Sequence, residues 1–480
     1  MFWWDPALSI RFDVDGDSGA MINAGLIKLS DAGWPGELKQ LCKNIGFGTL
    51  NPGIIDELKT RLSPDISQIV VEYPYRDFDF SSTYSMFYTK KHRRVSRESL
   101  RMHFFGNKIQ QAGYYGFMTL RPSLVDQRGR SHISPKAVKK PEPVYIVTAN
   151  STAHLFGQPF TVESFPWMAQ ETDIAVCAHV AVWSIINYYA VKYSRYRSFS
   201  IAEIAAEVPG FLGRTIPSEG LNLLQISTLL TKAGFYPLFL KKNPQDPRPF
   251  FQAIYAYIES GIPLVGVMTK MEHAVAIMGH GPLKNVPSIK NKDTFQWSAD
   301  YIDEFIISDD NHLPFTSVSR DGTEGSYCFE DLDYIVIPLY EKMYLNANVV
   351  IERVRYLIES NGLKIPPNAV CRPYLTSTRS LKRQAYSNNS MNADLKNILL
   401  RLPTPQFVWC ADFMTAEDGF DNTFSRIIID ATAGTYEAEP WLLLHDNECV
   451  LYFDSDIDQW YRLDIQIKPY STYINNLKGY

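Results

Sequence analysis

The sequence lacks several features that identify large classes of protein. Its six cysteines form no CxxC pair, which excludes the common structural zinc sites and thioredoxin-type redox sites. No GxxxxGK[ST] or GxGxxG phosphate loop occurs, so nucleotide-driven chemistry has no support. The apolar runs are all shorter than the roughly 18 residues of a membrane span. The first residues, Met1–Asp5, lack the basic and apolar regions of a secretory signal, and we therefore expect a cytoplasmic protein with no membrane contact.

Neither sign of charge dominates the chain. There are 47 Lys and Arg against 52 Asp and Glu, and the formal net charge of −5 argues against non-specific binding to nucleic acid. The hydrophobic fraction of 45% and the charged fraction of 21% are ordinary globular values, which excludes wholesale disorder. A length of 480 residues predicts about three domains.

Composition separates the chain into three blocks. Residues 1–150 mix strand-like runs with polar loops, and the Lys-, Arg-, Ser- and Pro-rich stretch from Gln127 to Pro143 is predicted to be a connector. Residues 151–345 place apolar-faced helices before short strands, an order typical of an α+β fold. Residues 346–480 begin with a predicted helix over Val349–Ser360 and contain no catalytic signature. We expect the first and third blocks to be mixed α/β accessory regions around a catalytic domain.

The central block carries the clearest signals for individual elements. A helix is predicted after the loop Pro166–Asp173, from the apolar spacing between Ala178 and Tyr189. Ser200 and Glu203 have the spacing of a capping box at the start of a short helix. The further elements predicted are two helices that each stop at a glycine, over Asn222–Ala233 and Phe250–Ser260, and three strands, over Leu264–Met268, His273–Met278 and Phe305–Ser308.

Cys177 is the first candidate for catalysis. It lies where a polar loop meets the first turn of the predicted helix. Unpaired backbone N–H groups and the positive end of the helix dipole favour a thiolate at that position. Because the thiolate is the reactive form of cysteine, the position suits a nucleophile. The alternative interpretation is a small residue that fills the start of a buried helix.

Three further residues complete a candidate site. His273, at the start of a predicted strand, can face a cleft, accept the proton of Cys177 and later give it to a leaving amine. Asp309, at the end of the next strand, can orient the imidazole, and its neighbour Asp310 is the alternative because adjacent strand residues point to opposite faces. Gln170, in the loop before the helix, can join the Cys177 amide in stabilising an oxyanion.

The order of these residues resembles papain-like cysteine peptidases, most closely their bacteriocin-processing (C39-like) branch. Gln170–Tyr189 looks like the nucleophile helix of that family, and Ser260–Val265 followed by Glu272–Gly279 looks like its G-x-P and His strands. Phe305–Asp309 is similar to the strand that ends in the triad aspartate. The resemblance covers roughly residues 155–345, and it departs from the family pattern at three positions: Val176, Ala178 and Asp310.

The resemblance implies a helical half packed on an antiparallel sheet, with Cys177, His273 and Asp309 as a triad and Gln170 in the oxyanion hole. We therefore expect an intracellular peptidase that cleaves protein or peptide substrates through a thioester acyl-enzyme, without metal or cofactor. One alternative is acyl transfer or deamidation by the same residues, as in transglutaminases. The other is an inactive papain-like scaffold that binds a protein or nucleic acid. The flanking regions would gate access, recruit substrate or bind a regulatory protein partner.

Two other groups of residues are weaker candidates for a site. A basic run beside Phe87 and Tyr88 is interpreted as a solvated face, with docking of nucleic acid or an acidic partner as the alternative; it consists of Lys90, Lys91, Arg93, Arg94, Arg97 and Arg101. His179 follows Cys177 at a helical rotation of about 200°, so we expect it to pack away from the thiol. His280 is expected on the face of its strand opposite His273, which argues against a shared metal site.

Overall fold

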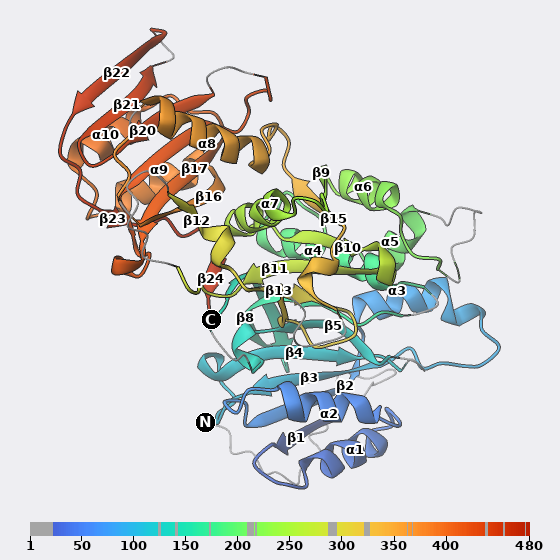
Figure 1. The fold of residues 1–480 in the computed structure, drawn as a ribbon. Coiled ribbons are helices and arrows are strands. Elements are labelled where there is room, and N and C mark those ends of the chain that lie inside the picture. The colour runs from blue at the N-terminus through green and yellow to red at the C-terminus, as the bar shows by residue number, and fades with distance from the viewer. Residues whose placement is uncertain are drawn as a thin grey trace.

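The computed structural model describes residues 23–122, 126–139, 143–171, 174–208, 216, 218–286, 295–320, 327–361, 363–366, 368–436, 440–454, 457–475 and 477–480. The fold is α+β, and it contains three large sheets whose described strand pairs are antiparallel except for one short parallel pair. Figure 1 shows these sheets following one another along the molecule, from the blue N-terminal part through the green centre to the red C-terminal part. Among the helices of the described ranges, none has the length and hydropathy needed to cross a membrane.

The first sheet has seven strands in the order β1-β2-β3-β4-β5-β8-β7. Its strands are β1 (Asn23–Lys28), β2 (Gln68–Tyr75), β3 (Ser99–Phe105), β4 (Tyr114–Leu120), β5 (Arg128–Ile133), β7 (Ala149–Leu155) and β8 (Gln158–Trp167). The helices of this part are α1 (Trp34–Asn44), α2 (Pro52–Arg61) and α3 (Phe78–Met86).

The prediction of a connector over Gln127–Pro143 is wrong for its first half. Arg128–Ile133 form β5, which pairs with β4 on one side and β8 on the other and is almost entirely buried. Its arginines resemble a solvated loop in sequence, but each has a carboxylate partner: Arg128 bonds Asp126, and Arg130 bonds Asp79 at 2.6 Å. Residues 140–142 of the stretch lie outside the described ranges.

The central part holds the predicted helices followed by strands. Its sheet runs β14-β13-β11-β10-β15-β9, and β6 adds to it between β11 and β24. The helices are α4 (Cys177–Lys192), α5 (Ile201–Glu207), α6 (Leu223–Lys232) and α7 (Arg248–Glu259). The strands are β6 (Tyr145–Val147), β9 (Tyr236–Lys241), β10 (Leu264–Met268), β11 (His273–His280), β13 (Glu304–Ser308), β14 (Thr316–Ser319), β15 (Tyr334–Leu339) and β24 (Leu477–Gly479).

Local signals explain why these helices begin and end where they do. The capping box of Ser200 and Glu203 is formed at the start of α5, and Asn222 and Gln225 form a second one at the start of α6. Gly234 follows α6 with φ +95°, the left-handed conformation that ends a helix at little cost for glycine. The predictions for these two helices are thus confirmed.

Helix α4 is buried on all sides because it lies between two sheets. It contacts β7 and β8 of the first sheet and β10 and β11 of the central sheet. Its side chains from Ala178 to Tyr189 are all buried, as expected for a helix that is apolar all round. The helix start that carries Cys177 is therefore fixed by packing on both faces.

The third sheet has the order β12-β16-β17-β19-β20-β21-β22, and β18 pairs separately with β23. Its strands are β12 (Gln296–Trp297), β16 (Ala369–Ser377), β17 (Phe407–Thr415), β18 (Asn422–Thr423), β19 (Ser425–Asp430), β20 (Trp441–His445), β21 (Cys449–Asp454), β22 (Gln459–Asp464) and β23 (Tyr470–Ser471). The helices are α8 (Ala347–Asn361), α9 (Thr378–Ser387) and α10 (Ala393–Arg401).

The sheets do not follow the three blocks of the sequence. Strands β7 and β8, from the start of the central block, complete the first sheet, and β12 of that block pairs with β16 of the third. Strand β24, near the end of the chain, pairs with β6 of the central sheet. One hydrophobic cluster contains buried residues of all three parts, among them Ile69, Trp183 and Trp409. The parts therefore share strands and a core.

Candidate active site

Cys177 is the first residue of α4, where the helix amides have no acceptors within the helix. Its thiol is half-buried, and Sγ lies 3.8 Å from the backbone oxygen of Glu272. Glu272 has the left-handed φ of +51°, a strained conformation for a residue other than glycine. The helix start and this strained turn thus bring the sulfur to the beginning of β11.

The other five cysteines have surroundings that disfavour a thiolate. Burial raises the pKa of Cys42 and Cys410 to about 12 and holds the pKa of Cys371 well above its ordinary value. The pKa values of Cys328 and Cys449 are raised by burial and by neighbouring aspartates. Cys177 is therefore the cysteine whose position suits a nucleophile.

His273 is the first residue of β11, and it faces both Cys177 and Asp309. Its Nε2 lies 3.3 Å from Asp309 Oδ1, an ion-pair distance at which the N–H is not well aligned with the oxygen. Burial lowers the pKa of the imidazole, but the contacts with Asp309 and Cys177 outweigh burial and raise this pKa to about 10. The imidazolium form is thus favoured between a carboxylate and a thiol.

Asp309, directly after β13, is held in place by a set of donors. Its side chain accepts hydrogen bonds from the Tyr327 hydroxyl at 2.7 Å and from the backbone N–H of Asn311 at 2.9 Å. Its backbone oxygen accepts from Trp167 Nε1 at 2.7 Å. Burial opposes ionisation, but the contact with His273 and the bonds from Asn311 and Tyr327 hold the pKa of the carboxyl well below its usual range. Asp309 therefore faces the imidazole as a carboxylate.

The geometry favours Asp309 over Asp310 as the partner of His273. Asp310 is 3% exposed, and its Oδ2 has no hydrogen-bond partner among the described residues. Burial and the adjacent Asp309 carboxylate raise the pKa of Asp310 to about 7. His273, Asp309 and Asp310 place one ligand atom each within 4.8 Å of one another. We assign no metal to this set, because the Asp309 carboxylate already accepts three hydrogen bonds from Asn311 and Tyr327.

Gln170 is brought to the same cleft as Cys177 and His273. The cleft has a volume of about 1100 Å³, with the residues around the start of α6 on one wall and the β10–β11 hairpin on the other. The backbone oxygen of Gln170 accepts from Arg121, which also pairs with the Glu171 carboxylate. The loop is thereby anchored, although Thr172 and Asp173 lie outside the described residues. The oxyanion role of the Gln170 amide stays a prediction.

Three residues that contact Asp309 were not predicted from the sequence: Trp167, Asn311 and Tyr327. Asn311 has a local signal, because Asp and Asn side chains in turns commonly accept from the backbone N–H two residues on. Trp167 and Tyr327 have none, since both reach Asp309 only through the tertiary fold. The nearby Glu272 turn was also missed.

The other two candidate histidines, His179 and His280, lie away from the cleft. His179 is buried within α4, and burial lowers its pKa to about 4, as expected of a packing residue. His280 follows an irregularity in the β11–β13 pairing, and its Nε2 lies 3.1 Å from Glu259. It lines a separate cavity of about 250 Å³ with Glu259 and Arg372.

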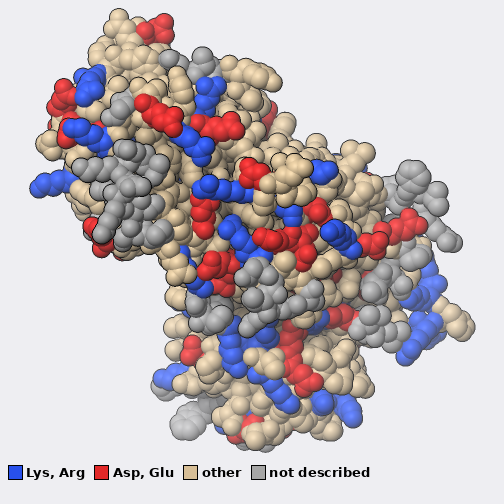
Figure 2. All heavy atoms as spheres, viewed as in Figure 1, with Lys and Arg blue, Asp and Glu red and all other residues tan. Residues whose placement is uncertain are grey.

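The basic run divides into two parts. Arg101 lies on β3, is buried, and pairs with Glu72 at 2.7 Å, so it does not belong to a surface. The exposed members are Lys90, Arg93, Arg94 and Arg97. Figure 2 shows blue side chains gathered at the edge of the molecule where the segment after α3 lies. These four residues face solvent, as predicted, whereas the prediction of a solvated face is wrong for Arg101. Lys91 is half-buried, with its ammonium over the Phe87 ring.

Comparisons of the chain with models of protein families, with characterised proteins and with solved structures gave no significant match. A function for the cleft must therefore be argued from its own residues. What the geometry brings together is a half-buried thiol at a helix start, an imidazole at a strand start, and a buried carboxylate at a strand end. This arrangement has the parts needed for nucleophilic catalysis by a cysteine.

Proposed function

We propose that the chain is a cysteine hydrolase with a papain-like core, and that its reaction is the cleavage of peptide bonds. The observation that carries the proposal is the sequence of contacts from Cys177 through His273 to Asp309 at the wall of one cleft. It is supported by the order of helices and antiparallel strands around the cleft.

Each residue of the triad has one role in the proposed reaction. The Cys177 thiolate attacks the carbonyl carbon of the scissile bond, and the C–S bond forms as the carbonyl electrons move onto oxygen. The Cys177 amide and the Gln170 side chain donate hydrogen bonds to that oxyanion. His273, as imidazolium, protonates the leaving amine when the C–N bond breaks. Asp309 stabilises the imidazolium throughout and keeps the ring oriented.

The second half of the reaction releases the acyl group. Neutral His273 takes a proton from water, the resulting hydroxide attacks the thioester, and the Cys177 thiolate leaves. The imidazolium and thiolate are then restored. The raised pKa of His273 supports this cycle because it favours the protonated ring that the resting ion pair and the leaving amine both require.

The proposal is tested by thiol labelling and hydrolysis of the full chain. Brief treatment with iodoacetamide near neutral pH, followed by peptide mapping, should modify Cys177 in preference to the other five cysteines. Cys177→Ala should abolish cleavage of a peptide library. Cys328→Ala is the matched control, because Cys328 is the other half-buried cysteine and lies outside the triad.

The outcomes separate the proposed peptidase from other uses of the same residues. Cleaved backbones that depend on Cys177 and His273 support the proposal. A mass gain of about one unit at glutamine, or cross-linking to an amine, would assign acyl transfer or deamidation instead, since these share the acyl-enzyme step. Cleavage by Cys177→Ala, or labelling spread evenly over the cysteines, would contradict a Cys177-based reaction.

A further inference from the structure

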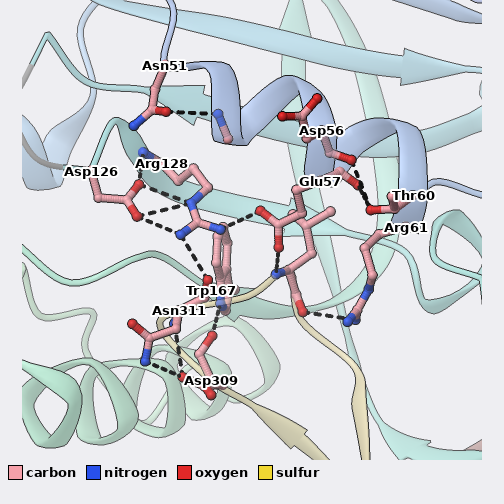
Figure 3. A network of polar contacts seen from close by, with 12 residues as sticks. Asn51, Asp56, Glu57, Thr60, Arg61, Asp126, Arg128, Trp167, Asp309 and Asn311 are labelled. Carbon is pink, nitrogen blue, oxygen red and sulfur yellow. Dashed lines mark hydrogen bonds and ion pairs between the residues drawn. The ribbon is translucent and has the colours of Figure 1, made fainter. Parts of the chain in front are cut away.

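The loop that carries Asp309 is held from outside the central part of the fold. The side chains that hold it come from the first part: Glu57 and Arg61 of α2, Arg128 of β5, and Trp167 of β8. Figure 3 shows them converging on the segment that runs from Asp309 past Asn311. The sequence places these residues well over a hundred positions before the loop, and Glu57, Arg61 and Arg128 fall in the region expected to be accessory.

The contacts are made to the backbone of the loop, at alternate residues. Trp167 Nε1 donates to the Asp309 oxygen at 2.7 Å, and Arg128 Nη2 donates to the Asn311 oxygen at 3.1 Å. Arg61 Nη2 donates to the Leu313 oxygen at 3.3 Å. Glu57 accepts from the backbone N–H of Leu313. The backbone carbonyls of residues 309, 311 and 313 and the amide of residue 313 are thus held by side chains from three different elements.

Glu57 and Arg128 also bind each other, so the loop contacts form one network. Their side chains pair directly and are only 14% and 10% exposed, respectively, and Asp126 gives Arg128 a second carboxylate partner. The Arg128 guanidinium lies over the Trp167 ring, 5.4 Å from its centroid. Charged groups at this degree of burial hold their partners in defined geometry, because a broken contact leaves an unpaired charge.

We propose that Glu57 and Arg128 are positioning residues of the triad: they fix the backbone of residues 309–313 so that the Asp309 carboxylate faces His273. The inference rests on the proposed function of the Cys177 cleft. The link to chemistry runs through Asn311, whose oxygen is held by Arg128 and whose N–H donates to Asp309 at 2.9 Å. Displacement of Asn311 therefore removes a donor from the carboxylate that stabilises the imidazolium. The first part of the chain is on this view a component of the active site.

The test measures the ionisation of His273 through the pH dependence of hydrolysis. The groups that face His273 are Cys177 from α4, Asp309 and Asp310 after β13, and Tyr327, whose ring centroid lies 5.7 Å away. If Asp309 moves away, the imidazolium loses its carboxylate and its pKa falls. The fall of hydrolysis at alkaline pH, where the imidazolium loses its proton and can no longer protonate the leaving amine, should then shift to lower pH.

The variants are Glu57→Gln and Arg128→Gln, studied in the full chain. We expect kcat to fall by about 10- to 100-fold, with KM changed less than about twofold because neither residue lines the cleft. The alkaline limb of the pH profile should move down in both variants. Asp56→Asn is the matched control, since it changes the neighbouring carboxylate of α2, which is 74% exposed, and it should leave rate and profile unchanged.

A double-mutant cycle separates positioning from general destabilisation. In an Asp309→Asn background, Glu57→Gln should cause no further loss of kcat, because its effect is exerted through the Asp309 carboxylate. Trp167→Phe is a second route if Arg128→Gln fails to fold: it keeps an aromatic ring but removes the N–H that bonds the Asp309 oxygen. It should shift the alkaline limb in the same direction.

The inference would be overturned if the Glu57→Gln and Arg128→Gln variants fold and keep the pH profile of the wild type. The proposed triad would remain supported in that case. An equal loss of kcat in the wild-type and Asp309→Asn backgrounds would also overturn the inference. If the unmodified chain shows neither Cys177-dependent hydrolysis nor preferential Cys177 labelling, the proposed function fails first, and the positioning role fails with it.

Discussion

Asp309 and Asp310 are consecutive buried residues, and the pKa values of their carboxyl groups are shifted in opposite directions. The pKa of Asp309 is held below its usual range by His273, Asn311 and Tyr327 against the effect of burial, whereas burial and the Asp309 carboxylate raise the pKa of Asp310 to about 7. Ionisation of both carboxyl groups in one buried site costs free energy, because the two negative charges repel each other. The contacts of Asp309 decide which of them carries the charge.

Asp309→Asn should lower kcat/KM by about 100-fold or more, because the imidazolium loses the carboxylate charge that stabilises it. Asp310→Asn is the matched substitution at the adjacent position. It should change kcat/KM much less, since Asp310 already favours its neutral form. Steady-state hydrolysis by both variants checks the prediction, and the opposite ranking would transfer the role in the triad to Asp310.

Asp310 should also make the fold less stable as the pH rises through about 7. A group whose pKa is raised by folding contributes stability below its unfolded value, here about 3.8, and loses that contribution as pH rises through the folded value. Asn has the same shape without the titration. Urea unfolding of wild type and Asp310→Asn at pH 5 and pH 8 should therefore show the variant gaining stability relative to wild type at the higher pH. A difference that stays constant between the two pH values would contradict this assignment.

The helices around the cleft could be predicted where the residues that specify them are close together in the sequence. The capping box at Ser200 and the glycine after α6 depend on residues within one turn, and both were confirmed. The start of α4 at Cys177 follows from the change from polar loop to apolar helix. Such features are specified by neighbouring residues, so one sequence is sufficient to identify them.

The parts of the fold that were missed depend on distant partners. Strand β5 looked like a connector because the carboxylates of Asp79 and Glu57, which neutralise its arginines, lie far away in sequence. The pairing of β24 with β6 could not be expected either, since strand register is set by contacts across the whole chain. For the same reason the sequence predicts a loop at Trp167 and gives no indication of its contact with Asp309.

The contact between the central and third parts depends on a buried ion pair that should be sensitive to loss of one partner. Arg372 of β16 lies 3.1 Å from Glu259 of α7, and Glu259 also binds His280 and the Tyr255 hydroxyl. Burial opposes ionisation of Glu259, but Arg372 and His280 lower its pKa to about 2. Arg372→Met should reduce the free energy of unfolding by about 3–5 kcal/mol, because a buried carboxylate is left without its main partner.

Urea unfolding with the double variant Arg372→Met/Glu259→Gln checks the cause of that loss. Removing both charges should recover part of the stability, since no unpaired charge remains. Arg462→Met is the control: Arg462 forms an exposed ion pair with Asp464, and its loss should not measurably change the unfolding transition. A double variant less stable than Arg372→Met would contradict the ion-pair explanation.

Residues 151–345, expressed alone, should fail to form the site even though they contain all four candidate catalytic residues. This segment lacks β5, the partner of β8, and β6 and β24, which extend the central sheet from β11. It also lacks Glu57 and Arg128, which hold the Asp309 loop, and Asp79, which accepts a hydrogen bond from Trp183 of α4. We expect a segment without a cooperative thermal transition by circular dichroism and without preferential labelling of Cys177. The full chain serves as the control and should show both properties. A folded and selectively labelled 151–345 segment would show that the first sheet is dispensable, and it would contradict the dependence of the Asp309 loop on α2 and β5.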